Sequence, residues 1–166
     1  MPIVECGFPA GFPSATPSLS PADALVFFGP TIQVDIGFDP TAFAQAGAAL
    51  PAAPNAPQQP IAPMQNVLAL VDTGATESCI DEDLATQLQL PLVDQQVTGG
   101  VGGQTTLNMY LATVQIPGLR TGQYGRFSGA RLAAGGSPHR AILGRTLLRG
   151  TIMIYDGQAG SVKLVR

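Results

Sequence analysis

The chain has 166 residues, close to the size of a single domain, which excludes a large multi-domain assembly. Hydrophobic residues make up 45% of the chain and charged residues only 11%, a balance that supports a packed core and excludes a largely disordered protein. The net charge of -3 and the absence of a Lys/Arg cluster argue against a nucleic-acid partner, because nucleic-acid binding requires a positive surface. The 20 glycines and 15 prolines favour a loop-rich β protein over a helical bundle.

Residues 1–24 are predicted to form an arm that precedes the main domain. Prolines recur there at intervals that block a helix, so we expect extended or irregular backbone. These prolines are Pro2, Pro9, Pro13, Pro17 and Pro21. The domain itself is expected to span residues 25–166. In Thr31–Phe38 apolar and polar side chains alternate, which predicts a half-buried strand.

Residues 40–63 change in composition to alanine, proline and glutamine with almost no charge. Such a segment is typical of a long loop or linker. The residues that precede it are too few to form a core of their own, so we interpret it as an insertion loop within one domain.

A short apolar run, residues 67–71, fits a strand that is buried on both faces. Asp81 is a candidate N-cap for the helix expected next, since acids follow it and Leu84 and Leu88 share one helix face. This helix should end before Pro91.

The glycine cluster at residues 99–103 is predicted to form the tip of a hairpin. An alternating stretch follows it as far as Pro117, and residues 118–138 are expected to be irregular. Residues 141–143 then form a short strand, and the last 16 residues form a terminal hairpin that turns around Asp156.

The informative feature is a carboxylate placed at the end of an apolar strand, in Asp72-Thr73-Gly74-Ala75. Desolvating an aspartate costs free energy, so its position requires an explanation. The glycine permits a tight turn and the threonine hydroxyl can hold a neighbouring group. One explanation is a catalytic carboxylate; the other is a turn aspartate that caps the local backbone.

Three segments, taken in order and spacing, resemble the retropepsins, the single-domain aspartic proteases of the retroviral type, in a bacterial-type form. They are Leu70-Val71-Asp72-Thr73-Gly74-Ala75, Gly99-Gly100-Val101-Gly102-Gly103 and Ala141-Ile142-Leu143-Gly144-Arg145-Thr146-Leu147-Leu148. The likeness covers about residue 66 to the C-terminus and leaves the 40–63 insertion outside. The resemblance implies an all-β fold, a closed barrel or sandwich with one or two short helices, in a homodimeric acid protease.

The resemblance also implies a mechanism. Hydrolysis by this chemistry requires two carboxylates that share a proton, and the chain has one Asp-Thr-Gly, so each subunit of a homodimer would contribute its Asp72. The expected substrate is an extended peptide or protein, with no metal or organic cofactor. Further roles implied by the family are active-site support by Thr73, Gly74 and Ala75, a flap formed by Gly100, Val101 and Gly102, an apolar subsite at Ile142, and a structural role for Arg145.

Two positions depart from the family pattern. Thr76 occupies the first of the places where viral members carry acids, so we expect Arg145 to lack its usual partner or to find it in Glu77 or another acid. Thr146 replaces the usual Asp or Asn. Both changes leave the catalytic pair intact.

The remaining reactive residue types are assigned structural roles. Cys6 and Cys79 are expected to be free thiols, and Cys79 a small core residue rather than a nucleophile, because no cation adjoins it in sequence to lower its pKa. His139 is expected to be a solvated loop residue. The sequence shows neither a signal peptide nor a long apolar span, which predicts a cytoplasmic protein without a membrane partner.

Two hypotheses from other functional classes remain open. The chain could be a catalytically silent retropepsin-like module that binds peptides or mediates dimerisation, since a fold does not determine an activity. It could also be an accessory domain whose arm and insertion become ordered on a partner.

Overall fold

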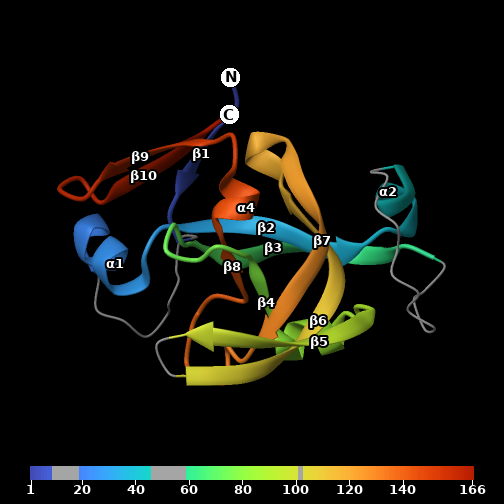
Figure 1. Ribbon diagram of the computed structural model, residues 1–166. Helices are drawn as coiled ribbons and strands as arrows, with labels where there is room; N and C mark the ends of the chain where they lie inside the picture. The colour runs from blue at the N-terminus through green and yellow to red at the C-terminus, as the bar shows by residue number, and fades with distance from the viewer. Residues whose placement is uncertain (9–18, 46–58, 101–102) are drawn as a thin grey trace.

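The computed structural model describes residues 1–8, 19–45, 59–100 and 103–166 (Figure 1). The strands are β1 (Ile3–Cys6), β2 (Thr31–Phe38), β3 (Ile61–Val71), β4 (Cys79–Asp81), β5 (Leu92–Gly100), β6 (Gly103–Ile116), β7 (Thr121–Ala130), β8 (Ala141–Leu143), β9 (Ile152–Asp156) and β10 (Ser161–Val165). The helices are α1 (Pro21–Phe28), α2 (Pro40–Gln45), α3 (Glu82–Gln87), α4 (Arg145–Leu148) and the 3-10 turn η1 (Pro117–Leu119). The all-β class is confirmed, although the described part of the chain has four short α-helices where one or two were expected.

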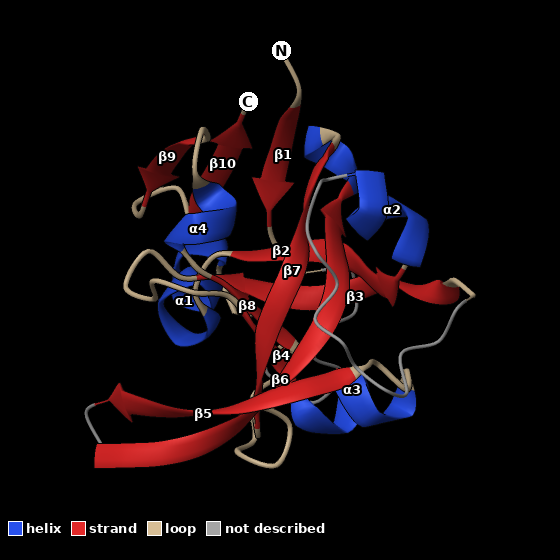
Figure 2. Cartoon of the chain, turned by 45° about the vertical axis from the view of Figure 1, so that its right-hand side comes forward, coloured by secondary structure: helices blue, strands red, loops and turns tan. Residues whose placement is uncertain are grey.

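Seven strands form one sheet in the order β2-β3-β8-β4-β7-β6-β5, and β2 also pairs with β6. The additional pairing, from Asp35 opposite Gln115 to Gly37 opposite Thr113, closes the sheet into a barrel. Strand β5 lies outside this closure and pairs with β6 alone. In Figure 2 the β5–β6 hairpin extends away from the barrel. The predicted closed barrel is therefore confirmed.

The barrel interior is filled by the apolar side chains that the sequence pattern placed inside. In β2, Ile32, Val34 and Ile36 are almost fully buried while Gln33 between them is exposed, as the alternation predicted. Helix α3 follows β4 and buries Leu84, which confirms the predicted helix. These buried residues form one continuous hydrophobic core, to which nearly every barrel strand contributes.

A second, three-stranded sheet brings the two ends of the chain together in the order β1-β10-β9. The β9–β10 pair confirms the predicted terminal hairpin. Strand β1 pairs antiparallel with β10, from Ile3 opposite Val165 to Cys6 opposite Val162, and the termini lie side by side in Figure 1. Residues 1–24 were expected to be extended or irregular, and Ile3–Cys6 is indeed extended, as a strand whose backbone hydrogen bonds are satisfied by a partner strand from the far end of the chain.

The same prediction was wrong at Pro21, where α1 begins. The Ser20 hydroxyl accepts a 3.1 Å hydrogen bond from the Asp23 backbone N–H, which caps the helix. Proline is tolerated at the first position of a helix because the N–H that it lacks would have no partner inside the helix. Residues 9–18 of the predicted arm lie outside the described residues.

The predicted loop at residues 40–63 was wrong at both ends. Helix α2 (Pro40–Gln45) follows β2 directly and buries Phe43, whose ring lies 5.4 Å from that of Phe38 and 6.2 Å from that of Tyr124. At the other end β3 already begins at Ile61. Burial of an aromatic side chain provides the free energy that orders the first part of this segment. Residues 46–58 lie outside the described residues.

Residues 118–138 were expected to be irregular, yet β7 occupies Thr121–Ala130. This strand pairs with β6 from Thr121 to Ser128 and with β4 from Ser128 to Ala130. Its glycines lower its apparent strand propensity, but a Cβ at Gly129 would lie 2.7 Å from the Tyr110 ring. Glycine is used here for close packing within a strand rather than for a loop. None of the helices in the described ranges is long and apolar enough to cross a membrane.

Candidate active site

Asp72 lies at the carboxyl ends of two parallel strands. Strands β3 and β8 pair in parallel, with Val71 opposite Leu143, and the Asp72 backbone N–H donates a 3.0 Å hydrogen bond to the Leu143 carbonyl. In the apolar run that precedes Asp72, Val67, Ala69 and Val71 are buried but the two leucines between them are only partly buried. The prediction of a strand buried on both faces was therefore wrong for one face, and Asp72 itself is partly exposed. The sheet therefore ends at the point where the carboxylate reaches solvent.

The carboxylate is oriented by its own turn. Its Oδ1 accepts a 2.8 Å hydrogen bond from the Gly74 N–H, and the Asp72 carbonyl accepts one of 3.3 Å from the Ala75 N–H. A turn aspartate would make the same bonds, so these contacts alone do not distinguish the two explanations that the sequence left open. Thr73 and Gly74 are exposed and Ala75 is partly exposed.

Arg145, at the start of α4, holds the loop that follows Asp72. Its Nη1 donates to the carbonyls of Thr73 at 2.7 Å and Gly74 at 3.0 Å, and its Nη2 donates to the Thr76 hydroxyl at 2.7 Å. The backbone of Arg145 also binds this loop, because its N–H donates a hydrogen bond to the Ala75 carbonyl. Arg145 thus contacts Thr76, and no ion pair between its guanidinium and Glu77 is found among the described residues.

Gly144 lets this loop pack directly against the end of β8. A Cβ at Gly144 would lie 2.5 Å from the Glu77 carbonyl oxygen and 2.8 Å from that of Thr76, so only glycine fits. Its N–H donates a 3.0 Å hydrogen bond to the hydroxyl of Ser78, a buried residue. Sequence reasoning missed Ser78, because its partner is 66 residues away along the chain.

Asp81 occupies the predicted N-cap position of α3, but its side chain makes no capping hydrogen bond. Its fully buried carboxylate instead accepts hydrogen bonds at Oδ1 from the backbone N–H groups of Leu132 and Ala133, at 2.9 and 3.0 Å. The Arg140 Nε lies 2.8 Å from Oδ2 and forms an ion pair with it. The predicted capping role was wrong because the loop after β7 offers this carboxylate better donors and a cation.

Cys79 and Ile142 lie next to each other in the sheet beside Asp72. Ile142 in β8 is opposite Leu70 of β3 and opposite Cys79 of β4, and its side chain is partly exposed. Burial is the main reason that the pKa of the Cys79 thiol is raised to about 11, and the Asp72 charge acts in the same direction. Cys79 and Cys6 are both free thiols, as predicted, but Cys79 is partly buried and is not part of the buried core. Its raised pKa argues against a role as nucleophile.

His139 is buried, which corrects the expectation of a solvated loop residue. Its Nε2 lies 2.7 Å from the Thr31 hydroxyl, and its ring stacks obliquely near Phe8 with centroids 5.8 Å apart. Burial lowers the pKa of the imidazole. Its partner is 108 residues away, so nothing near it in sequence indicated this environment.

Gly100, one of the predicted flap residues, is the last residue of β5 in the β5–β6 hairpin. The two strands pair as far as Gly100 opposite Gly103, which confirms the hairpin up to its last pair. Val101 and Gly102 of the predicted flap lie outside the described residues.

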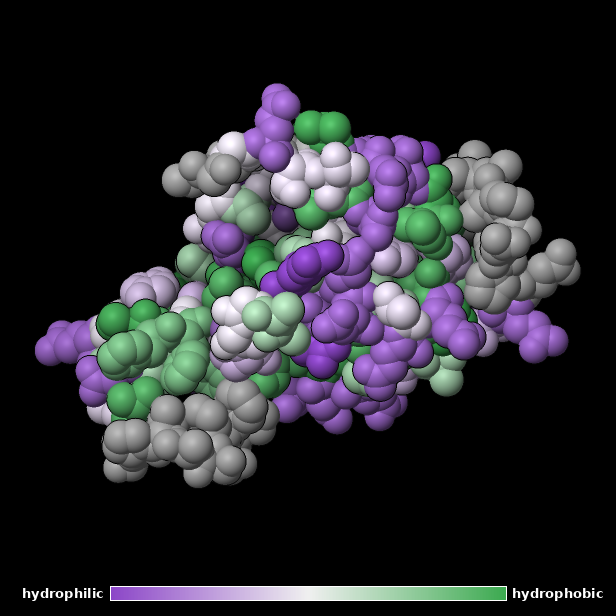
Figure 3. All heavy atoms as spheres, turned by 90° about the horizontal axis from the view of Figure 1, so that it is seen from below, coloured by the Kyte–Doolittle hydropathy of each residue, from purple (hydrophilic) through white to green (hydrophobic). Residues whose placement is uncertain are grey.

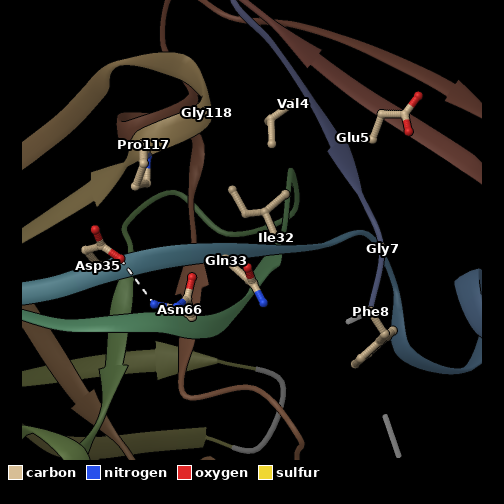
Figure 4. A pocket seen from close by; sticks show the side chains of 10 residues that line it. All are labelled: Val4, Glu5, Gly7, Phe8, Ile32, Gln33, Asp35, Asn66, Pro117 and Gly118. Atoms are coloured by element: carbon tan, nitrogen blue, oxygen red, sulfur yellow. Dashed lines mark hydrogen bonds between the residues drawn. The ribbon is translucent and has the colours of Figure 1, made fainter. Parts of the chain in front are cut away.

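A separate hollow of about 360 Å³ lies between β1, β2 and η1 and does not include Asp72. Figure 4 shows Ile32 and Val4 at its centre and Asp35 beside Asn66, whose N–H donates a 3.1 Å hydrogen bond to the Asp35 carboxylate. Glu5 points away from this hollow and pairs with Lys163 at 3.3 Å. The hollow therefore contains no group of the Asp72 loop.

Comparison with known proteins adds an independent observation. Residues 64–149, more than half of the chain, match the model of the family described as gag-polyprotein putative aspartyl protease. This segment begins in β3, contains Asp72, the β5–β6 hairpin and Arg145, and ends just after α4. A search of curated proteins found no match. The chain therefore belongs to the gag-polyprotein aspartyl protease family, and its barrel is a retropepsin-like aspartic protease domain.

Proposed function

We propose that the protein is an aspartic endopeptidase that acts as a homodimer, with one Asp72 from each copy in the catalytic pair. The observation that carries this proposal is Asp72 itself, partly exposed at the end of β3 and in a loop bound by Arg145, within the segment that matches the aspartyl protease family. This chemistry needs two carboxylates and the chain has one Asp-Thr-Gly. A second copy related by a two-fold axis provides the other.

The two carboxylates share one proton, because like charges in contact cannot both ionise. The ionised carboxylate takes a proton from water as the water oxygen attacks the scissile carbonyl carbon, and the protonated carboxylate gives its proton to the carbonyl oxygen. In the second step one diol hydroxyl returns a proton to the pair, the C–N bond breaks, and the amine leaves with the proton of the other carboxyl group. The pair regains one proton and titrates as a unit.

The neighbouring residues receive roles from the same proposal. Thr73 bonds with its symmetry mate, and Gly74 and Ala75 line the cleft and contact the substrate backbone. Ile142 forms part of an apolar subsite, and Arg145 positions the loop through its bonds to the carbonyls of Thr73 and Gly74.

The β5–β6 hairpin serves as the flap in this proposal. Gly100, Val101 and Gly102 close over the bound peptide and exclude water from the catalytic pair. Residues 25–166 form the protease domain, and residues 1–24 precede it, with β1 completing the terminal sheet.

Exposed apolar side chains support a partner subunit. On α1, Val26 and Phe27 are 78% and 71% exposed, and on β9 Ile152, Ile154 and Tyr155 are more than half exposed. In Figure 3 hydrophobic atoms gather at the left of the face seen from below, on the side where α1 lies in Figure 1. Exposed apolar surface of this kind marks an interaction site, and a second copy is the occupant that the catalytic pair requires.

The test is cleavage of a diverse mixture of unstructured peptides between about pH 4 and 7, where a coupled pair can hold one proton. Wild type, Asp72→Asn and Asp83→Asn are compared side by side. Asp83 is an exposed aspartate of α3 and serves as the matched control. We expect cleavage by the wild type and the control only, with a specific activity that falls on dilution as dimers separate.

Failure to cleave would favour the alternative function, provided that sedimentation shows a dimer at the concentration used. The protein would then be a catalytically silent retropepsin-like module that binds peptides or mediates dimerisation. Cleavage by Asp72→Asn at the wild-type rate would contradict the proposed chemistry directly.

A further inference from the structure

A hollow of about 350 Å³ lies beside the Asp72 loop, between the end of that loop and the β5–β6 hairpin. Its lining includes Glu77 and Ser78 at the end of that loop, the apolar side chains of Leu107 and Met109 in β6, and Arg126 of β7. Every one of these residues belongs to the described part of the chain.

This hollow is lined in part by the loop that follows Asp72. Glu77, which lines the hollow, lies five residues after Asp72 in the same loop. The Ser78 hydroxyl accepts a hydrogen bond from the N–H of Gly144, next to Arg145. In the sheet, β8 and β4 separate β3 from β7, and β6 follows β7. A peptide that extends from Asp72 under the hairpin would therefore pass over the hollow. The inference below rests on the proposed function, because it assumes that a peptide substrate binds at Asp72.

The charges around the hollow do not cancel. Arg126 is paired with Asp94, with 3.7 Å between Nη1 and Oδ2. Glu77 is exposed and its side chain has no hydrogen bond or ion pair among the described residues, since Arg145, one partner considered for it, bonds to Thr76 instead. Two carboxylates and one guanidinium leave a net negative charge, and the unpaired group is Glu77.

The lining also suits the stem of a long side chain. Leu107 and Met109 can contact a chain of methylene groups while a charged end reaches the carboxylate of Glu77. An acidic side chain would meet an unpaired carboxylate and a guanidinium that already has a partner. A basic side chain gains a new ion pair.

We propose that this hollow is a substrate subsite for a lysine or arginine side chain, and that Glu77 determines this specificity. Exposed Glu77 attracts a basic side chain and repels an acidic one, and the two effects together give about a tenfold preference. Arg126 opposes the bound cation, so its removal should increase the preference.

The experiment uses two readouts on peptides in which each position around a cleaved bond carries Lys, Arg, Gln or Glu in turn. The first is kcat/KM of the wild type, and the second is fluorescence anisotropy of labelled peptides bound to Asp72→Asn, which needs no catalysis. We expect one position at which Lys and Arg exceed Glu about tenfold. Glu77→Gln should reduce this ratio to about unity, and Arg126→Gln should raise it. Glu5→Gln, whose side chain lies on β1 in the other sheet, should leave it unchanged.

The possible results separate the two proposals. Cleavage that depends on Asp72 but shows no basic preference, or a preference that survives Glu77→Gln, overturns the subsite and leaves the protease proposal intact. Absence of cleavage contradicts the protease proposal, while the binding readout still decides the subsite: equal binding of Lys and Glu peptides, or no binding of either, overturns it. A binding preference lost in Glu77→Gln and kept in Glu5→Gln supports it.

Discussion

The Nη2 of Arg145 donates a 2.7 Å hydrogen bond to the hydroxyl of Thr76. Thr76 stands where an acid was expected, and the hydroxyl satisfies the guanidinium without a charge. The other nitrogen, Nη1, binds two backbone carbonyls of the same loop. The loop after Asp72 is thus held mainly through its backbone, so an uncharged residue at position 76 suffices.

Arg145→Met should loosen this loop. The substitution removes three hydrogen bonds from a charged donor but keeps an apolar stem of similar length, and since the site is exposed we expect a loss of about 1–2 kcal/mol. For a chain of this size the Tm should fall by about 3–6 °C. Arg149→Met is the matched control, because Arg149 is exposed and its side chain has no hydrogen bond or ion pair among the described residues. Equal Tm values for the two variants would contradict the positioning role.

Thr76→Asp should stabilise the loop by placing a carboxylate against Arg145. The gain is about 0.5–1 kcal/mol at pH 7 because the pair is exposed. The neighbouring guanidinium lowers the pKa of the new carboxyl group in the folded state, so the gain is present above its unfolded pKa of about 4 and is lost as the pH falls through the folded value. Thermal denaturation at pH 7 and pH 3 measures the difference. Thr76→Val, which has no hydroxyl, should be less stable than the wild type at both pH values.

Gly144→Ala should destabilise the protein by about 1–3 kcal/mol. The added Cβ would lie 2.5 Å from the Glu77 carbonyl oxygen and 2.6 Å from its carbon, and backbone atoms cannot move aside as a flexible side chain can. Gly125→Ala is the control, because no atom lies within 4 Å of the Cβ position in β7. Urea denaturation of both variants tests the contrast, and a Gly144→Ala midpoint equal to that of the control would refute the packing argument.

Asp81→Asn should destabilise far more than Asp94→Asn. Asp81 is fully buried, and its loss as an anion leaves Arg140, whose side chain is only 34% exposed, without a counterion. We expect a loss of about 2–3 kcal/mol, below the full cost of breaking a buried pair because Arg140 reaches solvent. Asp94 pairs with Arg126 at 3.7 Å on the surface, so its substitution should change stability by at most about 1 kcal/mol. Chemical denaturation of both variants at pH 7 provides the comparison.

Features set by local sequence could be predicted. The alternation in Thr31–Phe38 specifies β2 because each apolar side chain faces the barrel interior. Asp72 stood out because a polar turn directly follows an apolar run, and the cost of desolvating a carboxylate requires a reason for that position. The β9–β10 hairpin was predictable because the residues of its turn are adjacent in sequence.

Features set by distant partners could not be predicted. Strand β1 depends on pairing with β10, and the burial of His139 depends on Thr31, far earlier in the chain. Strand β7 was missed because glycine has low strand propensity, while Gly129 is needed there to accommodate Tyr110. Asp81 was assigned to its nearest helix, whereas its donors lie about fifty residues later. In each case tertiary contacts override the local preference.

His139 should make the folded state less stable in mild acid, within the range in which the proposed protease would be assayed. Burial beside Thr31 and Phe8 lowers the pKa of the imidazole in the folded state, so the unfolded state binds the proton more readily. The contribution of the neutral ring to stability is therefore complete above the unfolded pKa of about 6.5 and decreases as the pH falls below it. We expect the Tm of the wild type to fall more between pH 7 and pH 5 than that of His139→Gln, which has no titrating group at this position. Because His139 is the only histidine of the chain, the ring-proton resonance in an NMR titration reports its pKa directly. A pKa at or above that of a model imidazole, together with parallel Tm profiles for the two proteins, would show that the buried ring accepts its proton without penalty.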